Sequence, residues 1–152
     1  MKILEVLKKE AVLTDLKAGD KKGVLEELAT PLARIADLEH QDLVKVLLER
    51  ERLGSTGIGG GIGIPHGKLK SLEQLVLGVG ISRKGVDFDS MDNQPTHIFF
   101  LLVTPENSTG IHLKVLAQIS RLLKDDLLKD RLLAAADADA VLALIHERDE
   151  EF

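Results

Sequence analysis

His66 stands in the one segment of this chain whose composition is unusual. Seven of the thirteen glycines fall between Gly54 and Gly67, and such density usually marks special backbone torsions or the close approach of another group. Pro65 fixes its own φ and restricts the residue before it, while Gly67 removes the side chain that follows, so the backbone at His66 is stiff and open on one side. A neutral imidazole held in this way can act as a nucleophile while its second nitrogen donates to an orienting group. The alternative is a structural histidine that pairs with a backbone carbonyl in a turn.

A nucleotide-binding loop is excluded by the spacing of the same segment. Five residues, not four, separate Gly61 from Gly67-Lys68, and Leu69 stands where a Walker motif needs Ser or Thr for magnesium. No G-x-G-x-x-G pattern occurs in the stretch. The glycines therefore predict some other use of the backbone, such as N–H groups exposed to a phosphoryl group.

The segment from Glu51 to Gly67 closely resembles the phosphohistidine signature of the enzyme IIA domains in the fructose, mannitol and nitrogen-regulatory branch of the phosphotransferase system. It departs from that signature at Gly63, where the family has alanine. Two further segments and a later dipeptide look like the nitrogen-regulatory members, so the resemblance extends over nearly the whole chain. The signature residues are Glu51, Ile58-Gly59 and Ile62-Gly63-Ile64-Pro65-His66-Gly67; Leu48–Gly57 overlaps its start, and Phe88–Pro95 and His112-Leu113 lie after it.

This resemblance implies a phosphoryl relay. Family members take a phosphoryl group from a histidine phosphocarrier, HPr or its nitrogen-system counterpart, onto the histidine that His66 matches. Sugar-system members pass it to an enzyme IIB, whereas nitrogen-regulatory members mostly use their phosphorylation state to bind or release regulatory targets. No metal, nucleotide or other cofactor is implied for the transfer.

Four further residues are candidates for the site. Phosphoryl transfer depends on positioning and charge stabilisation, so donors near His66 matter most. His112 lies on an apolar helical stripe, which favours a core histidine, but the resemblance makes it a second active-site histidine. Arg50 matches the family's arginine near the site, and its alternative is a solvated helix charge. Ser55 and Thr56 would add phosphate-binding hydroxyl groups.

The composition excludes several other functions. The net charge of −5 and pI near 5.5 argue against nucleic acid as a partner. The absence of cysteine excludes thiol catalysis and Cys-ligated metals. His40, His97 and His146 are interpreted as structural, and no metal site is expected.

The helices and strands expected from the sequence form one α/β domain over residues 1–152, with a mixed sheet of about four or five strands flanked by helices. Asp20 is expected to cap a helix that Pro31 kinks or ends early. The expected strands and helices are strands 11–16, 75–82, 86–88 and 96–104, and helices 20–35, 41–53, about 109–123, 126–136 and 139–148.

No targeting or membrane segment is expected. Charges interrupt the first ten residues, and the longest apolar run, Ile98 to Val103, is far shorter than the roughly 20 residues that span a bilayer. We therefore expect a cytoplasmic protein with no membrane insertion.

Three functions remain open from the sequence: a nitrogen-regulatory enzyme IIA, a fructose-type enzyme IIA that serves a separate IIB, and a binding module that is never phosphorylated. The chain ends at Phe152 without a linker toward a IIB or IIC domain, which slightly favours the regulator. Relay partners meet transiently, so an apolar patch with a charged rim is expected around His66.

Overall fold

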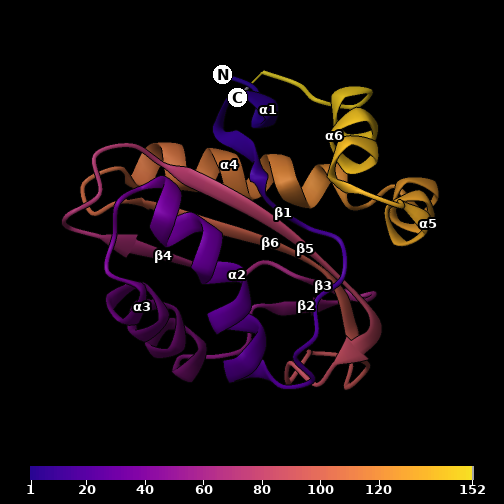
Figure 1. Cartoon of the computed structure of the whole chain (residues 1–152), viewed down its shortest axis with the longest axis horizontal. Coiled ribbons are helices and arrows are strands. Elements are labelled where there is room, and N and C mark those ends of the chain that lie inside the picture. The colour runs from indigo at the N-terminus through magenta and orange to yellow at the C-terminus, as the bar shows by residue number, and fades with distance from the viewer. Residues whose placement is uncertain (152) are drawn as a thin grey trace.

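A computed structural model describes residues 1–151, which form a single α/β domain around one mixed sheet (Figure 1). The strands span Leu7–Leu13 (β1), Gly57–Gly59 (β2), Ile62–Gly63 (β3), His66–Leu69 (β4), Val76–Val86 (β5) and Thr96–Pro105 (β6). Within these residues the sheet has six strands in the order β1-β5-β6-β3-β2, and β4 also pairs with β6. The strand pairs β1–β5, β3–β6 and β4–β6 are parallel, while β5–β6 and β2–β3 are antiparallel. The fold class expected from the sequence is confirmed.

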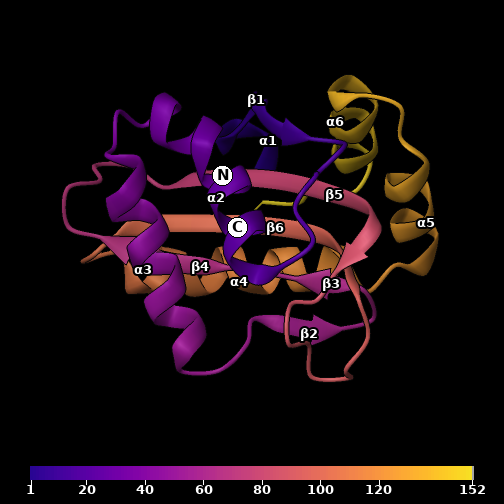
Figure 2. The same ribbon diagram turned by 60° about the horizontal axis from the view of Figure 1, so that its bottom comes forward.

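Six helices of the described residues cover the two faces of this sheet. They span Ile3–Val6 (α1), Lys21–Ile35 (α2), His40–Arg52 (α3), Thr109–Leu122 (α4), Asp126–Ala134 (α5) and Ala138–His146 (α6). Helices α2 and α3 lie on one face, and α4, α5 and α6 lie on the other (Figures 1 and 2). The two ends of the chain lie side by side, where the Met1 amino group pairs with Glu151.

The central strand β6 is apolar on both faces because both are covered. Its residues alternate between the two cores: Ile98, Phe100 and Leu102 pack with α4 to α6, whereas Phe99, Leu101 and Val103 pack with α2 and α3. This alternation decides which side chains can meet at the end of the strand.

Most of the expected helices and strands are confirmed, whereas two strands and the expected effect of Pro31 differ. The first strand is β1, several residues earlier than the predicted 11–16. Helix α2 begins after the Asp20 cap, whose side chain accepts from the Gly23 N–H, but it runs past Pro31 to Ile35 instead of ending early. Of the predicted strand 86–88 only Val86 lies in a strand, as the last residue of β5, directly after Gly85 with its positive φ of 89°.

Candidate functional site

The glycine-rich segment forms a tight hairpin rather than an open anion loop. β2 and β3 are antiparallel, and Gly59 at the end of β2 and Gly60 and Gly61 in the turn have φ values of 93°, 66° and 79°. These left-handed torsions are those that glycine adopts without strain. The Gly60 N–H donates to Asp92 (3.0 Å), and the Gly57 N–H donates to the Ser55 hydroxyl (3.0 Å). Three of the seven glycines are therefore explained by the turn, and the N–H groups of Gly57 and Gly60 already have partners.

The space around Gly63 favours glycine over alanine. A Cβ at this position would lie 3.2 Å from both the Phe99 ring and the Thr96 methyl group. The alanine of the family signature would therefore be tight here, and Phe99 occupies the space that the missing methyl group leaves.

His66 is the first residue of β4, where it pairs with Leu102 of β6. Its Nδ1 lies 2.7 Å from the carbonyl oxygen of Ile64. Because a carbonyl only accepts, Nδ1 carries the proton and donates it, which leaves a lone pair on Nε2. Burial, with a smaller effect of the Arg50 charge, lowers the pKa of His66 below its usual 6.5. The imidazole is therefore neutral at pH 7 and its Nε2 can act as a nucleophile.

The residues on both sides of His66 fix its backbone. The Pro65 carbonyl accepts from the Leu102 N–H (3.0 Å), which ties this stretch to the central strand. A Cβ on Gly67 would lie 2.7 Å from Cγ1 of Val46, so α3 packs directly against the backbone of β4. Only glycine allows this close approach.

His112 lies in the first turn of α4 and faces His66. The two ring centroids are 5.3 Å apart in an edge-to-face arrangement, and His112 is only 5% exposed. Its Nδ1 lies 2.7 Å from the hydroxyl oxygen of Thr104, which is itself fully buried at the end of β6. Burial lowers the pKa of His112 to about 4, with smaller electrostatic effects from the neighbouring His66 ring and the Lys68 ammonium. This second imidazole is therefore also neutral at pH 7.

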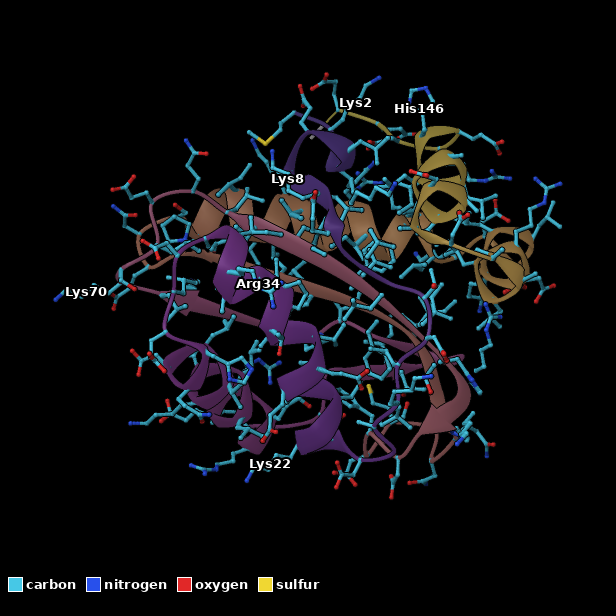
Figure 3. The ribbon with its side chains drawn as sticks, in the orientation of Figure 1. Lys2, Lys8, Lys22, Arg34, Lys70 and His146 are labelled. Atoms are coloured by element: carbon cyan, nitrogen blue, oxygen red, sulfur yellow. The ribbon has the colours of Figure 1, made fainter. Side chains whose placement is uncertain are left out.

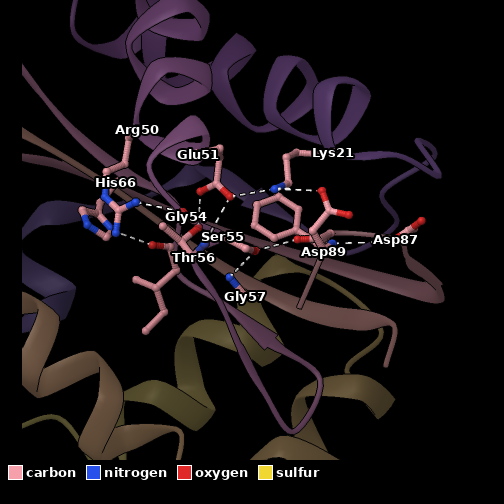
Figure 4. A network of polar contacts seen from close by, with 12 residues as sticks. Lys21, Arg50, Glu51, Gly54, Ser55, Thr56, Gly57, His66, Asp87 and Asp89 are labelled. Carbon is pink, nitrogen blue, oxygen red and sulfur yellow. Dashed lines mark hydrogen bonds and ion pairs between the residues drawn. The ribbon is translucent and has the colours of Figure 1, made fainter. Parts of the chain in front are cut away.

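Two cations lie near the histidines. Arg50, on the last turn of α3, donates from Nη1 to the Gly54 carbonyl (2.9 Å) and lies beside His66 (Figure 4). Lys68, two residues after His66 on β4, donates to the Thr109 hydroxyl (3.0 Å) and lies close enough to His112 for its charge to lower the pKa of that ring. Sequence reasoning selected Arg50 but missed Lys68.

Ser55 and Thr56, predicted to bind phosphate, have other partners in this structure. The Ser55 hydroxyl donates to the Phe88 carbonyl (2.7 Å). The Thr56 hydroxyl donates to Glu51 and is buried. A phosphate-binding role for either would require its hydroxyl to change partners, so that role stays a prediction.

Glu51 and Lys21 form a buried ion pair behind these two residues. Lys21 Nζ lies 3.2 Å from Glu51 and 3.2 Å from Asp89, and it lies 5.0 Å from the centre of the Phe88 ring (Figure 4). The sequence pointed to Glu51 only as a member of the signature. Lys21, thirty residues earlier in the chain, carried no local signal.

The other histidines have structural partners or lie outside the site. His40 Nε2 lies 3.1 Å from the Glu26 carbonyl and His97 Nδ1 lies 2.8 Å from the Ser82 carbonyl, while His146 is exposed on α6 (Figure 3). Within residues 1–151, no group of three or more His, Cys, Asp or Glu side chains is arranged to hold a metal ion. None of the helices over the same residues is long and apolar enough to cross a membrane.

Fold and site together define an α/β domain that carries two facing histidines and an arginine at one edge of its sheet. The chain belongs to the family described as "Phosphoenolpyruvate-dependent sugar phosphotransferase system, EIIA 2", whose sequence model matches residues 5–148.

Two curated relatives illustrate the range of that family. The chain is 41% identical over 145 residues to a nitrogen regulatory protein of Bradyrhizobium diazoefficiens, which covers 95% of each chain. It is 35% identical over 151 residues to the fructose-specific EIIABC component of Bacillus subtilis, matching 99% of this chain but 24% of that protein.

Solved structures agree in fold. The crystal structure of nitrogen regulatory protein IIA-Ntr from Neisseria meningitidis has a TM-score of 0.88 and 35% identity, over 93% of this chain and 97% of that one. The mannitol IIA of Escherichia coli, at 22% identity, shares the fold with a TM-score of 0.78 over 91% of this chain and 97% of that one.

Proposed function

We propose that this chain accepts a phosphoryl group on Nε2 of His66 from a histidine phosphocarrier and regulates protein partners through its phosphorylation state. The observation that carries the proposal is the hydrogen bond from Nδ1 of His66 to the Ile64 carbonyl. It holds a neutral imidazole with the Nε2 lone pair free, which is the state that an attacking nitrogen needs. The donor is HPr or its nitrogen-system counterpart.

The reaction is a displacement at phosphorus between two imidazoles. Nε2 of His66 forms a bond to phosphorus while the phosphorus–nitrogen bond of the donor breaks, and the donor ring, protonated on its other nitrogen, leaves as a neutral imidazole. Negative charge is spread over three equatorial oxygens, so the protein contributes mainly positioning and electrostatic stabilisation. No step of this transfer requires a metal or a nucleotide from this chain.

Two neighbours supply that stabilisation. The guanidinium of Arg50 is suited to binding phosphoryl oxygens with two parallel hydrogen bonds. His112 is held through Nδ1 by Thr104, so Nε2 is the nitrogen left for the phosphoryl group. When Thr104 donates to Nδ1, the neutral ring carries its proton on Nε2 and donates from there. Ser55 and Thr56 are retained as phosphate ligands only in a rearranged, phosphorylated state.

The regulatory role is favoured by the relatives named nitrogen regulatory proteins, among them the one from Bradyrhizobium diazoefficiens. A sugar-specific role is the second candidate, because the chain is also 35% identical to a segment of a fructose-specific component. In that case the phosphoryl group passes to an enzyme IIB. Leu53, Ile58 and Met91 are exposed apolar side chains that such partners could contact. Both roles place the protein in the cytoplasm.

The test is the intact mass of the protein after incubation with phosphoenolpyruvate, enzyme I and a phosphocarrier. We expect an acid-labile gain of one phosphoryl group that His66→Ala abolishes and His112→Ala only slows. His146→Ala, on the exposed surface of α6 (Figure 3), is the matched control and should behave as wild type. No gain with carriers of both the sugar and the nitrogen systems would instead favour a binding module that is never phosphorylated.

Transfer of the phosphoryl group to an enzyme IIB distinguishes the sugar-specific role from the regulatory one. The phosphorylated protein is mixed with a fructose-type IIB and fructose, and the loss of the phosphoryl group is followed by mass. Rapid loss that depends on IIB would favour the sugar role, whereas a persistent phosphoryl group favours the regulatory one.

A further inference from the structure

An unbroken chain of hydrogen bonds leads from a buried carboxylate to the reactive imidazole. Glu51 accepts from both the N–H (3.1 Å) and the hydroxyl of Thr56. The Thr56 carbonyl accepts from the Ile64 N–H (3.0 Å), and the Ile64 carbonyl accepts from Nδ1 of His66 (2.7 Å). Figure 4 shows Glu51 with its partners Thr56 and Lys21, and His66 at the other end of the network.

We infer that Glu51, with Lys21 as its counter-ion, is a positioning residue that holds His66 in its Nδ1–H form with Nε2 facing the incoming phosphoryl group. Neither side chain contacts the reacting atoms. They act by fixing the Thr56 backbone, which fixes the Ile64 backbone, whose carbonyl orients the ring. The inference rests on the proposed function for its catalytic meaning, but the tautomer that it predicts exists without any phosphoryl group.

Because it is largely buried, the Glu51–Lys21 ion pair can fix the position of the Thr56 backbone. The side chain of Glu51 is only 3% exposed and that of Lys21 19%. A carboxylate at such a depth requires partners for its charge and lone pairs, because an unpaired one is strongly unfavourable. Its partners here are the two Thr56 donors and the Lys21 ammonium, so the position of Thr56 follows from that of Glu51.

The contacts require an ionised carboxylate rather than an amide. Both oxygens of Glu51 accept from Thr56, one from the N–H and one from the hydroxyl. A glutamine has only one oxygen, and its NH2 group cannot accept from Thr56. Glu51→Gln therefore keeps the shape of the side chain while breaking one of the two contacts and leaving Lys21 without a charge partner at this end.

Three variants and two matched controls test the inference. Glu51→Gln removes the charge and one of the two acceptor oxygens, Lys21→Met removes the counter-ion and Thr56→Val removes only the hydroxyl. Glu49→Gln and Lys22→Met make the same chemical changes on exposed neighbours in the same helices, and Lys22 points away from the protein (Figure 3).

The first readout is the tautomer of His66 in the unphosphorylated protein, measured from ¹⁵N chemical shifts and long-range ¹H–¹⁵N couplings of the ring. Wild type and both controls should show a protonated Nδ1 and an unprotonated Nε2. In the three variants we expect the Nε2–H form to become measurable. The second readout is the rate of phosphoryl acceptance, which should fall about three- to tenfold, the loss of one net hydrogen bond.

Each outcome bears on the inference. If folded Glu51→Gln and Lys21→Met proteins keep the wild-type tautomer and rate, the positioning role is wrong. If Thr56→Val slows acceptance while the tautomer stays unchanged, Thr56 binds the phosphoryl group directly and does not act through the chain. Should Glu51→Gln fail to fold, the Lys21 and Thr56 variants decide. If wild type is never phosphorylated, the proposed function fails, whereas the tautomer readout still tests the chain.

Discussion

Acidification should destabilise this fold through His112. Burial, with smaller electrostatic effects from the neighbouring His66 ring and the Lys68 ammonium, lowers the pKa of His112 from 6.5 to about 4. In the unfolded chain the imidazole titrates near 6.5. Between these two values the unfolded state binds a proton that the folded state does not, so the free energy of unfolding falls as the pH falls through this window. Below about pH 4 both states are protonated and this group adds nothing further.

The size of the effect follows from the shift. Each pKa unit corresponds to about 1.4 kcal/mol, so a pKa lowered from 6.5 to about 4 corresponds to about 3 kcal/mol across the window. The ring is only 5% exposed, so solvent screening reduces this little. His66, whose pKa is also lowered by burial, contributes in the same direction.

Urea denaturation at pH 7.5 and pH 4.5 measures the effect. The chain has no Trp or Tyr, so unfolding is followed by circular dichroism. Carboxylates also titrate in this range, and comparison with His112→Gln isolates the histidine. We expect the wild type to lose about 2–3 kcal/mol more than this variant, while His146→Gln, on the surface, loses as much as wild type. Equal losses in wild type and His112→Gln would refute the assignment of a depressed pKa to His112.

Three substitutions test the packing and charge of the site. Gly67→Ala should lower the free energy of unfolding by about 1–3 kcal/mol because its Cβ would lie 2.7 Å from Val46. Adding Val46→Ala to this variant should restore part of the lost stability, and no recovery would contradict the contact. Gly63→Ala should lower the free energy of unfolding by less than about 1.5 kcal/mol, since the Phe99 ring at 3.2 Å can shift slightly. A larger loss of this free energy would show that the ring is fixed. Arg50→Lys keeps the charge but not the planar fork, so phosphoryl acceptance should slow about tenfold at unchanged Tm; an unchanged rate would remove Arg50 from the site.

The sequence predicted the features that depend on local pattern. Apolar spacing located α3 and the central strands, and Asp20 marked the start of α2. The stiff backbone around His66 follows from Pro65 and Gly67, whose effects on the chain are local.

The features that sequence reasoning missed depend on contacts between distant segments. Lys21 and Thr104 reach the site only because α2 and β6 are brought to it by the fold, and neither lies in a recognisable motif. The partners of Ser55 and Thr56 were not predictable either, since a hydroxyl beside a glycine-rich turn can face a ligand or the protein interior. The structure gives them Phe88 and Glu51.

The central claim, that Nε2 of His66 is the atom that accepts the phosphoryl group, is tested most directly by NMR of ¹⁵N-histidine-labelled protein phosphorylated by its carrier. Phosphorus–nitrogen coupling identifies the modified atom. We expect one phosphohistidine, at Nε2 of His66, with Nδ1 still protonated and bonded to the Ile64 carbonyl. A phosphoryl group on Nδ1 of His66, or on any other residue, would contradict it.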